Sequence, residues 1–359
     1  MAVGRRSRWL AGWRLVWVAG VLAALATWAL WGAPARGVTL DAQGSGVSAY
    51  GGWAAWSRPV AAGGFELVVR SPQGTISIAP VAAKPRPFDV GLGPSAGGVA
   101  AVFSVCPDGT CHIERLRLGV AGAEPTTLAI PGGGSDREPA IWNDVVAFVR
   151  RNPTGGSDNP QDPGRRPDLL FEWRIGARRV AALTLPTTRA VRQSFAGGGW
   201  PAGLTGTIDS LTLRGTEVAY STTTGAPDNP QFGIMALWLE DERGAPHLVD
   251  TTTGGAGNVC LPSFDSPVIR GPWLYAYLRA CATSDNEDRF TRYGLDGHGA
   301  EVAQHNFLHY LDDELTTVVP DGAGVDWDDF GIQHLARLRW APIARPVAQT
   351  FCGVRAPIC

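Results

Sequence analysis

The feature that most constrains the fold is a short motif that returns along the chain at intervals of 41 to 72 residues. Each copy opens with a turn-forming pair and runs into an apolar stretch, in which a small residue precedes a large β-forming residue. The small residues are Ala55, Ala101, Ala147, Ala219, Ala276 and Thr317. A period in the forties with occasional insertions is typical of a β-propeller, whose blades are four-stranded sheets. A β-sandwich with coincidental similarity between its strands is the alternative.

Two further kinds of segment fill the intervals. Strands with aromatic or aliphatic residues are expected at 65–71, 112–119, 169–176, 233–240, 289–296 and 334–341. Shorter edge strands are expected at 75–80, 126–131, 178–185, 246–250 and 300–304. Alternating hydrophobicity and the flanking Gly, Pro and Asp residues favour strands over helices.

The predicted fold class is therefore all-β: a six-bladed β-propeller over residues 38–345, preceded by one N-terminal transmembrane or signal helix within residues 1–37. Residues 346–359 form a C-terminal segment. The sixth blade lacks an outer strand of its own, which either 38–42 or 347–351 could supply. In the first case, the beginning of the chain would pair with the last blade and protect the sheet edges.

Composition agrees with a turn-rich β protein. The chain has 46 Gly and 27 Pro among 359 residues, and only 18% of its residues are charged. These values exclude a coiled coil and a long helical bundle. The formal net charge of −2 argues against nucleic-acid binding, which requires a basic excess.

The order of turn, apolar strand, loop, aromatic strand and edge strand resembles the six-bladed TolB-like propellers of bacterial envelopes. That family often carries a Ser-Pro-Asp-Gly turn in its first hairpin. The matching turns here are Tyr50-Gly51-Gly52, Arg214-Gly215-Thr216 and Arg270-Gly271-Pro272. The resemblance covers nearly all of the chain after the N-terminal segment. It implies a scaffold that binds a ligand or a protein, without a set of catalytic residues.

The N-terminal segment predicts export. Arg5, Arg6, Arg8 and Arg14 precede an uncharged stretch over residues 15–32. This stretch has about the length of a spanning helix, and basic residues before it place the amino end in the cytoplasm. Ala33-Pro34-Ala35 resembles a signal-peptidase site, so a cleaved, secreted form is the alternative to an uncleaved anchor in the cytoplasmic membrane.

Six cysteines fit an exported protein with disulfides. Local pairing is the simplest arrangement, which would join Cys106 with Cys111, Cys260 with Cys281, and Cys352 with Cys359. Lys84 is the only lysine, and the arginine-rich composition favours a bacterial source with GC-rich coding.

Candidate binding residues lie in segments that we expect to be loops at one end of the propeller. Three blades repeat an Asp-Asn pair, and the last blade carries an Asp-Trp-Asp sequence with further acids beside it. The candidates are Asp158, Asn159, Asp228, Asn229, Asp285, Asn286, Trp200, Asp326, Trp327 and Asp328. Asp and Asn also stabilise turns by bonding to their own backbone, which is the structural alternative. No metal or cofactor is predicted, although converging carboxylates would suit Ca²⁺.

These observations predict a membrane-tethered, extracytoplasmic propeller that binds an envelope protein, a peptide or a glycan, and no nucleic acid. The sequence has no GxSxG, Walker, GxGxxG or HExxH motif. Two alternatives remain: a glycan hydrolase or lyase that uses two loop carboxylates, and a purely structural envelope protein.

Overall fold

The computed structural model describes residues 38–151, 168–185, 206–226, 229–240, 244, 246–254, 263–279, 288–295, 300–306, 313–318, 323–329 and 336–342. Contacts within the chain divide it into two compact units, residues 1–38 and 39–359. Among the described residues, no helix has the length and apolar character needed to cross a membrane. The predicted transmembrane or signal helix within residues 1–37 lies outside the described residues.

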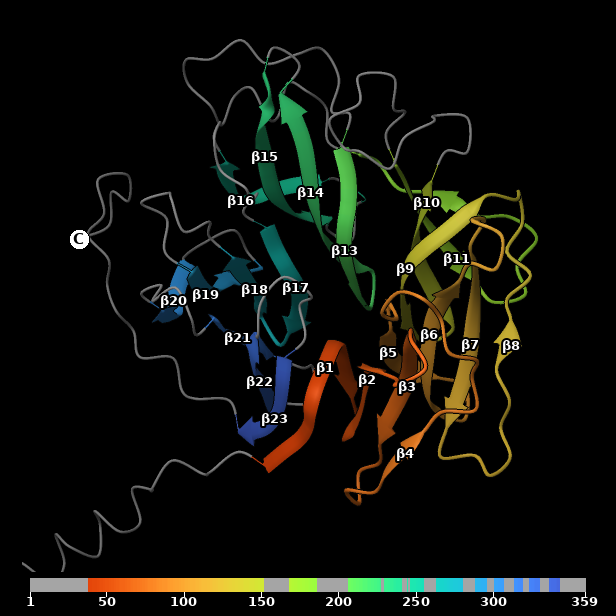
Figure 1. Ribbon diagram of the computed structural model, residues 1–359. Helices are drawn as coiled ribbons and strands as arrows, with labels where there is room; N and C mark the ends of the chain where they lie inside the picture. Colours follow the sequence, from red (N-terminus) through yellow and green to blue (C-terminus); the bar gives the residue numbers. More distant parts are fainter. Residues whose placement is uncertain are drawn as a thin grey trace, which may run out of the picture. The chain divides into compact units, whose positions relative to one another are not determined.

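The described residues form 23 strands in five sheets (Figure 1). One four-stranded sheet contains β5 (Gly91–Ser95), β6 (Gly98–Val105), β7 (His112–Leu118) and β8 (Thr126–Thr127). The next contains β9 (Ser135–Trp142), β10 (Val145–Arg151), β11 (Leu169–Arg174) and β12 (Ala181–Ala182). The third contains β13 (Gly206–Arg214), β14 (Glu217–Ala226), β15 (Asn229–Glu240) and β16 (Pro246–Gly254). The fourth contains β17 (Ser263–Arg270), β18 (Trp273–Arg279), β19 (Asp288–Gly294) and β20 (Ala300–Asn306). In all four, the strands follow one another in sequence order and pair antiparallel.

The fifth sheet has seven strands and joins the two ends of the described chain. Its order is β21 (Asp313–Val318), β22 (Ala323–Asp329), β23 (Ala336–Pro342), β1 (Val38–Tyr50), β2 (Trp53–Pro59), β3 (Phe65–Arg70) and β4 (Ile76–Ile78). Figure 1 shows β1 between β23 and β2. Only Ser45–Tyr50 of β1 pair with β2, which leaves the first part of this long strand outside that pairing.

The repeated alanines confirm the periodic pattern in the first five copies. Each one lies in the second strand of its four-strand group, namely β2, β6, β10, β14 or β18. Their exposed fractions are 0% for Ala55, Ala101, Ala147 and Ala219, and 1% for Ala276. A small side chain is needed at this position because neighbouring sheets pack face to face over it, and any larger one would overfill the interface.

Four clusters of buried residues among the described ones fill the spaces between successive sheets. Phe88 and Phe103 belong to the cluster between the first two four-strand groups, and Phe148 and Trp173 belong to the next. The third cluster includes Trp238, and the fourth joins the β13–β16 and β17–β20 sheets. The β5–β8, β9–β12 and β13–β16 sheets each have an apolar core on both faces, so successive sheets follow one another around a common axis. The chain is a β-propeller.

Two details of the predicted propeller are wrong. We expected six blades, whereas the described residues form five sheets, because β1 hydrogen-bonds to β23 as well as β2 and merges the first and last strand groups. The pairing of β1 with the last group is one of the two closures that the sequence left open. The sixth copy of the motif was also displaced by one strand. Residues 313–318 form β21, the first strand of its group, and β22 takes the second position that the alanine motif occupies elsewhere.

Tight turns close the first hairpins of the first five groups. The predicted turns at Gly51, Gly215 and Gly271 are present, and all three glycines have positive φ. The corresponding β9–β10 turn uses Asn143 and Asp144 in the same left-handed region, with φ of 47° and 62°. Asn and Asp tolerate this conformation better than other non-glycine residues.

Candidate functional site

A cavity of about 160 Å³ lies where the first strands of successive sheets meet. Its lining comes from Gly46–Ala49 in β1, Phe88–Leu92 at the start of β5, Glu138–Trp142 in β9, Ser210–Arg214 in β13 and Pro267–Ile269 in β17. Segments from five strand groups line one cavity only if these strands surround the axis. The cavity is therefore the described part of the axial channel.

The first strands carry extra residues at one level of this channel. In β9, Ala140 pairs with Ala147 and Arg137 pairs with Val149, so Glu138 and Pro139 together face a single residue of β10. Similar irregularities interrupt β1 between Ser45 and Ser48, β13 between Ile208 and Ser210, and β17 between Asp265 and Val268. A β-bulge bends its strand and redirects side chains. Four bulges at similar heights therefore shape one end of the cavity.

Glu138 occupies the β9 bulge and lines the cavity. Its φ is 49°, which is unusual for a residue with a long side chain. Its carboxylate accepts no hydrogen bond and makes no ion pair within the part of the chain that the structure describes. Burial raises the pKa of Glu138 well above its ordinary value, and the nearby carboxylates of Asp89 and Asp209 add to this shift.

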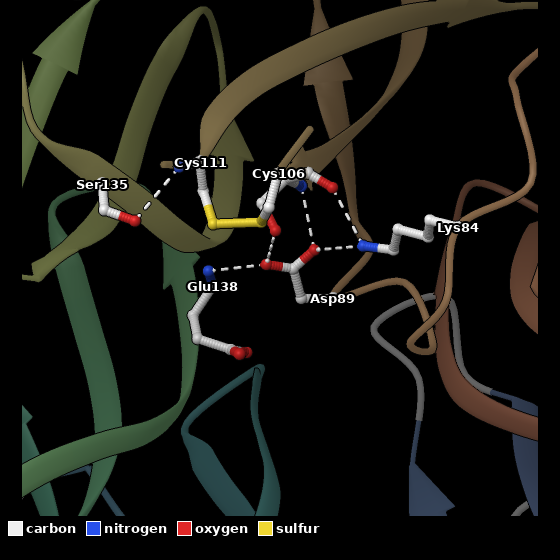
Figure 2. The surroundings of a disulfide bond; sticks show 7 residues. Lys84, Asp89, Cys106, Cys111, Ser135 and Glu138 are labelled. Atoms are coloured by element: carbon white, nitrogen blue, oxygen red, sulfur yellow. Dashed lines mark hydrogen bonds and ion pairs between the residues drawn. A yellow bond between two sulfur atoms is a disulfide. The ribbon is translucent and has the colours of Figure 1, made fainter. Parts of the chain in front are cut away.

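Asp89 holds the Glu138 backbone in place (Figure 2). The Glu138 amide donates to Asp89 Oδ2 at 2.9 Å. Ser104 donates to the same carboxylate twice, from its amide to Oδ1 at 2.8 Å and from its hydroxyl to Oδ2 at 2.5 Å. Figure 2 shows the Glu138 side chain directed away from Asp89. Asp89 thus has its acceptor positions occupied, while the Glu138 carboxylate remains available.

Lys84 completes this network. Its Nζ lies 3.4 Å from Asp89 Oδ1, donates to the Ser104 carbonyl at 2.9 Å and lies 4.4 Å from the centre of the Phe88 ring. Burial lowers the pKa of Lys84, and the Asp89 carboxylate opposes this shift. The lysine therefore serves as a local counter-ion for Asp89.

The predicted Cys106–Cys111 disulfide is confirmed, and it lies beside the same network (Figure 2). The backbone of Cys111 contacts the beginning of β9 twice. Its amide donates to Ser135 Oγ at 3.1 Å, and its carbonyl accepts from the Asp136 amide at 2.9 Å. The disulfide loop thereby fixes the stretch of β9 that leads into Glu138. The other predicted pairs, Cys260 with Cys281 and Cys352 with Cys359, lie outside the described residues.

Asp209 supplies a third carboxylate at this end of the channel. It occupies the β13 bulge, is exposed, and accepts from Thr223 Oγ1 at 2.5 Å. Its charge contributes to the raised pKa of Glu138, which places the two carboxylates within electrostatic reach. Over the described ranges, no group of three or more His, Cys, Asp or Glu residues is arranged to hold a metal ion.

The structure places few of the predicted binding residues. Asn229 begins β15, and Asp326, Trp327 and Asp328 lie within β22. The expectation that these three β22 residues form a loop is wrong, because their backbone pairs on both sides with β21 and β23. The remaining candidates lie outside the described residues: Asp158, Asn159, Trp200, Asp228, Asp285 and Asn286. The Ca²⁺ alternative stays a prediction.

Sequence reasoning missed Lys84, Asp89, Glu138 and Asp209 as site residues. The distance along the sequence between three of these residues and the repeated alanines could have identified them. Asp89, Glu138 and Asp209 precede the buried alanines of their own groups by nine to twelve residues. This offset corresponds to the start of the first strand, which our sequence analysis did not assign.

No protein-family model matches this sequence, and no curated protein sequence matches it. Among solved structures, the chain is similar to a protein described as TolB from Agrobacterium tumefaciens, with 12% identity and a TM-score of 0.41. The match covers 75% of this chain and 95% of that one.

Two enzyme structures are similar at the same level. An oligogalacturonate lyase in complex with manganese has 11% identity and a TM-score of 0.44, over 86% of this chain and 78% of that one. A prolyl endopeptidase has 13% identity and a TM-score of 0.43, over 84% of this chain and 42% of that one, so this chain spans less than half its length. Structural similarities with TM-scores below 0.5 assign no function to this chain. The evidence for the propeller fold is the arrangement of its sheets and of the apolar cores between them.

Proposed function

We propose that this chain is an exported propeller that binds a protein, peptide or glycan ligand at the end of the axial cavity where Glu138 lies. The observation that carries the proposal is a cavity lined by first strands from five groups, with a carboxylate that has no hydrogen-bond partner among the described residues. Binding sites are concave and hold a few polar groups at fixed positions. The Asp89 network and the β9 bulge fix Glu138 in this way.

We further propose that β21–β23 and the first part of β1 act as a sixth blade. The position of β1 between β23 and β2 supports this interpretation, since one strand would then close the ring by contributing to both of its ends. Closure of this kind leaves no long open sheet edge in the ring.

Export and tethering to a bacterial cytoplasmic membrane are also part of the proposal. Their support is the basic and apolar pattern of residues 1–37 together with the Cys106–Cys111 disulfide, since disulfides persist mainly in oxidising compartments. A fusion of alkaline phosphatase after residue 359 should be active and should sediment with membranes. An inactive fusion would contradict export, and activity in the soluble fraction would favour cleavage near Ala35.

Binding at the cavity can be tested with a variant that fills it. Val47 lines the cavity, and Val47→Trp should obstruct it, whereas Val120→Trp places the same side chain on an exposed turn. Both variants and the wild type would be screened against defined decapeptides and cell-wall glycan fragments. We expect Val47→Trp alone to lose binding. Equal binding by both variants would place the ligand elsewhere.

The same screen separates the alternatives. Mass spectrometry of each bound ligand after incubation should show it unchanged. A cleaved glycan would instead support the hydrolase or lyase, and a chain that binds no probe would support the purely structural role.

A further inference from the structure

The size of the axial cavity limits what can enter it. Its volume of about 160 Å³ corresponds to about five water molecules at ~30 Å³ each. Pockets for whole drug-sized ligands have volumes of roughly 300 Å³ or more. The cavity therefore accepts one group of side-chain size, while the rest of a larger ligand must remain outside.

Charge around Glu138 limits the chemistry of that group. The ionisable groups that act on Glu138 are Asp89, Lys84, Arg137 and Asp209. Arg214 of β13 also lines the cavity, and the lining segments of β1 and β17 bring no ionisable residue. Lys84 is already engaged with Asp89 and the Ser104 carbonyl. Around Glu138 itself, three carboxylates outnumber two cations, and the Arg214 guanidinium donates to the Gly271 carbonyl, so the local balance favours a positive guest.

Glu138 differs from the other two acids in its hydrogen bonding. Asp89 accepts from Ser104 and from the Glu138 amide, and Asp209 accepts from Thr223. Glu138 is half-buried, and its carboxylate has no donor within the described part of the chain. A carboxylate that is partly removed from water and has no protein donor forms a stronger hydrogen bond with a ligand than an exposed one does.

We propose that the axial cavity takes one ammonium or guanidinium group of a peptide ligand, with Glu138 as its counter-ion. This inference rests on the proposed function and names the ligand class for the same site. Glu138 lines the cavity from the β9 bulge, and the bond from the Glu138 amide to Asp89 holds the backbone there before the ligand arrives. Such preorganisation lowers the entropic cost of binding. A charge-assisted hydrogen bond in this setting corresponds to at least a tenfold change in affinity.

The test uses short peptides that differ in one group. The central residue of an acetylated and amidated Gly-Gly-Xaa-Gly-Gly peptide is Lys, Arg, norleucine or Glu, and an unacetylated pentaglycine amide tests an N-terminal ammonium. Affinity is measured by isothermal titration calorimetry at pH 7.5 and pH 5. We expect at least one cationic peptide to bind tenfold or more tightly than the norleucine peptide, and the Glu peptide to bind most weakly. The Lys, Arg and N-terminal arms identify the source of the cation.

Two variants connect this preference with Glu138. Glu138→Gln keeps the shape of the side chain and should abolish the preference for a cation. Glu172→Gln is the matched control, because Glu172 lies in β11 away from the cavity lining and burial also raises its pKa. The preference of the wild type for a cationic peptide should also weaken at pH 5, because protonation of Glu138 removes its charge. The other charged groups around Glu138 are Asp89, Asp209, Lys84 and Arg137.

The outcomes separate the two proposals. A norleucine peptide that binds as tightly as the cationic ones, or a preference that survives Glu138→Gln, overturns the ligand class. If glycans bind in the cavity and no cationic peptide does, the ligand class fails while the proposed function stands. If Val47→Trp changes the binding of no ligand, both fail.

Discussion

Removal of the Cys106–Cys111 disulfide should destabilise the propeller by an amount that its loop length predicts. The bond joins residues five positions apart and closes a loop of six residues. In the chain-entropy description, constraining a six-residue loop in the unfolded state is worth about 2 kcal/mol at 25 °C. Cys111 is only 1% exposed, so its replacement by alanine also removes buried volume, at a cost of about 1 kcal/mol.

The double variant Cys106→Ala, Cys111→Ala should therefore lose about 3 kcal/mol of unfolding free energy. Urea unfolding followed by circular dichroism measures this loss. Hydrogen exchange provides a second measurement, because the Cys111 carbonyl accepts from the Asp136 amide. Exchange at Asp136 and at the nearby Glu138 amide should become faster once the loop is free.

A reducing agent provides the control. Dithiothreitol should lower the stability of the wild type by about 2 kcal/mol beyond any effect on the double variant, because reduction opens the loop but keeps the cysteine side chains. The response of the double variant itself reports only the four remaining cysteines. If the double variant unfolds at the wild-type urea concentration with an unchanged slope, the loop is held by its hydrogen bonds. The argument from chain entropy would then be refuted.

Three further changes test the site and the core. Because the pKa of Glu138 is raised in the folded protein, the stability of the wild type falls as the pH rises from 4.5 through that raised value. Glu138→Gln should therefore be more stable than the wild type in urea unfolding at pH 7.5, and this difference should vanish below about pH 4.5. Arg150→Met should cost about 3–5 kcal/mol, since it leaves the buried Asp136 carboxylate without its two-point partner, and adding Asp136→Leu should restore part of the loss. Ala147→Leu should cost about 1–3 kcal/mol by overfilling a position that is 0% exposed between sheets, and an unchanged melting temperature would contradict the packing argument.

The second and third strands of the first five groups were predictable from sequence, and the clearest signal comes from the second strands, of which β2, β6 and β10 are buried almost continuously. Segments such as 97–104 and 143–150 are nearly continuous apolar runs bounded by turn residues, and they form β6 and β10. The deep burial of the repeated alanines follows from the same logic. The pattern of apolar residues therefore predicts the strand that packs between two neighbouring sheets.

The first strands were not predictable in this way, because their sequences look like loops. β5 reads Gly-Leu-Gly-Pro-Ser, and an added Cβ at Gly91 or Gly93 would meet the carbonyl oxygens of Pro139 and Ile141. These glycines are needed because β5 lies directly against β9. The bulges of β9, β13 and β17 contain Pro or Asp, which also suggest turns.

The site was missed for the same reason. Its carboxylates belong to first strands or their approaches, whereas the sequence analysis sought acids in the longer loops. The last group shows a related error: Asp326 and Asp328 alternate with Val325 and Trp327, a period of two that favours a strand, yet the abundance of acids suggested a loop.

The place of β1 between β23 and β2 has a consequence for how the protein is made. β1 emerges from the ribosome early, but its second partner is the last strand of the described chain. At ~5–20 residues per second, synthesis of the intervening chain takes roughly 15–60 s. Throughout that time one side of β1 lacks its neighbour, and contacts between such distant residues are slow to form. The nascent ring is thus an open arc with unpaired backbone at both ends, most exposed to proteases and to pairing with other chains shortly before its last strand is completed.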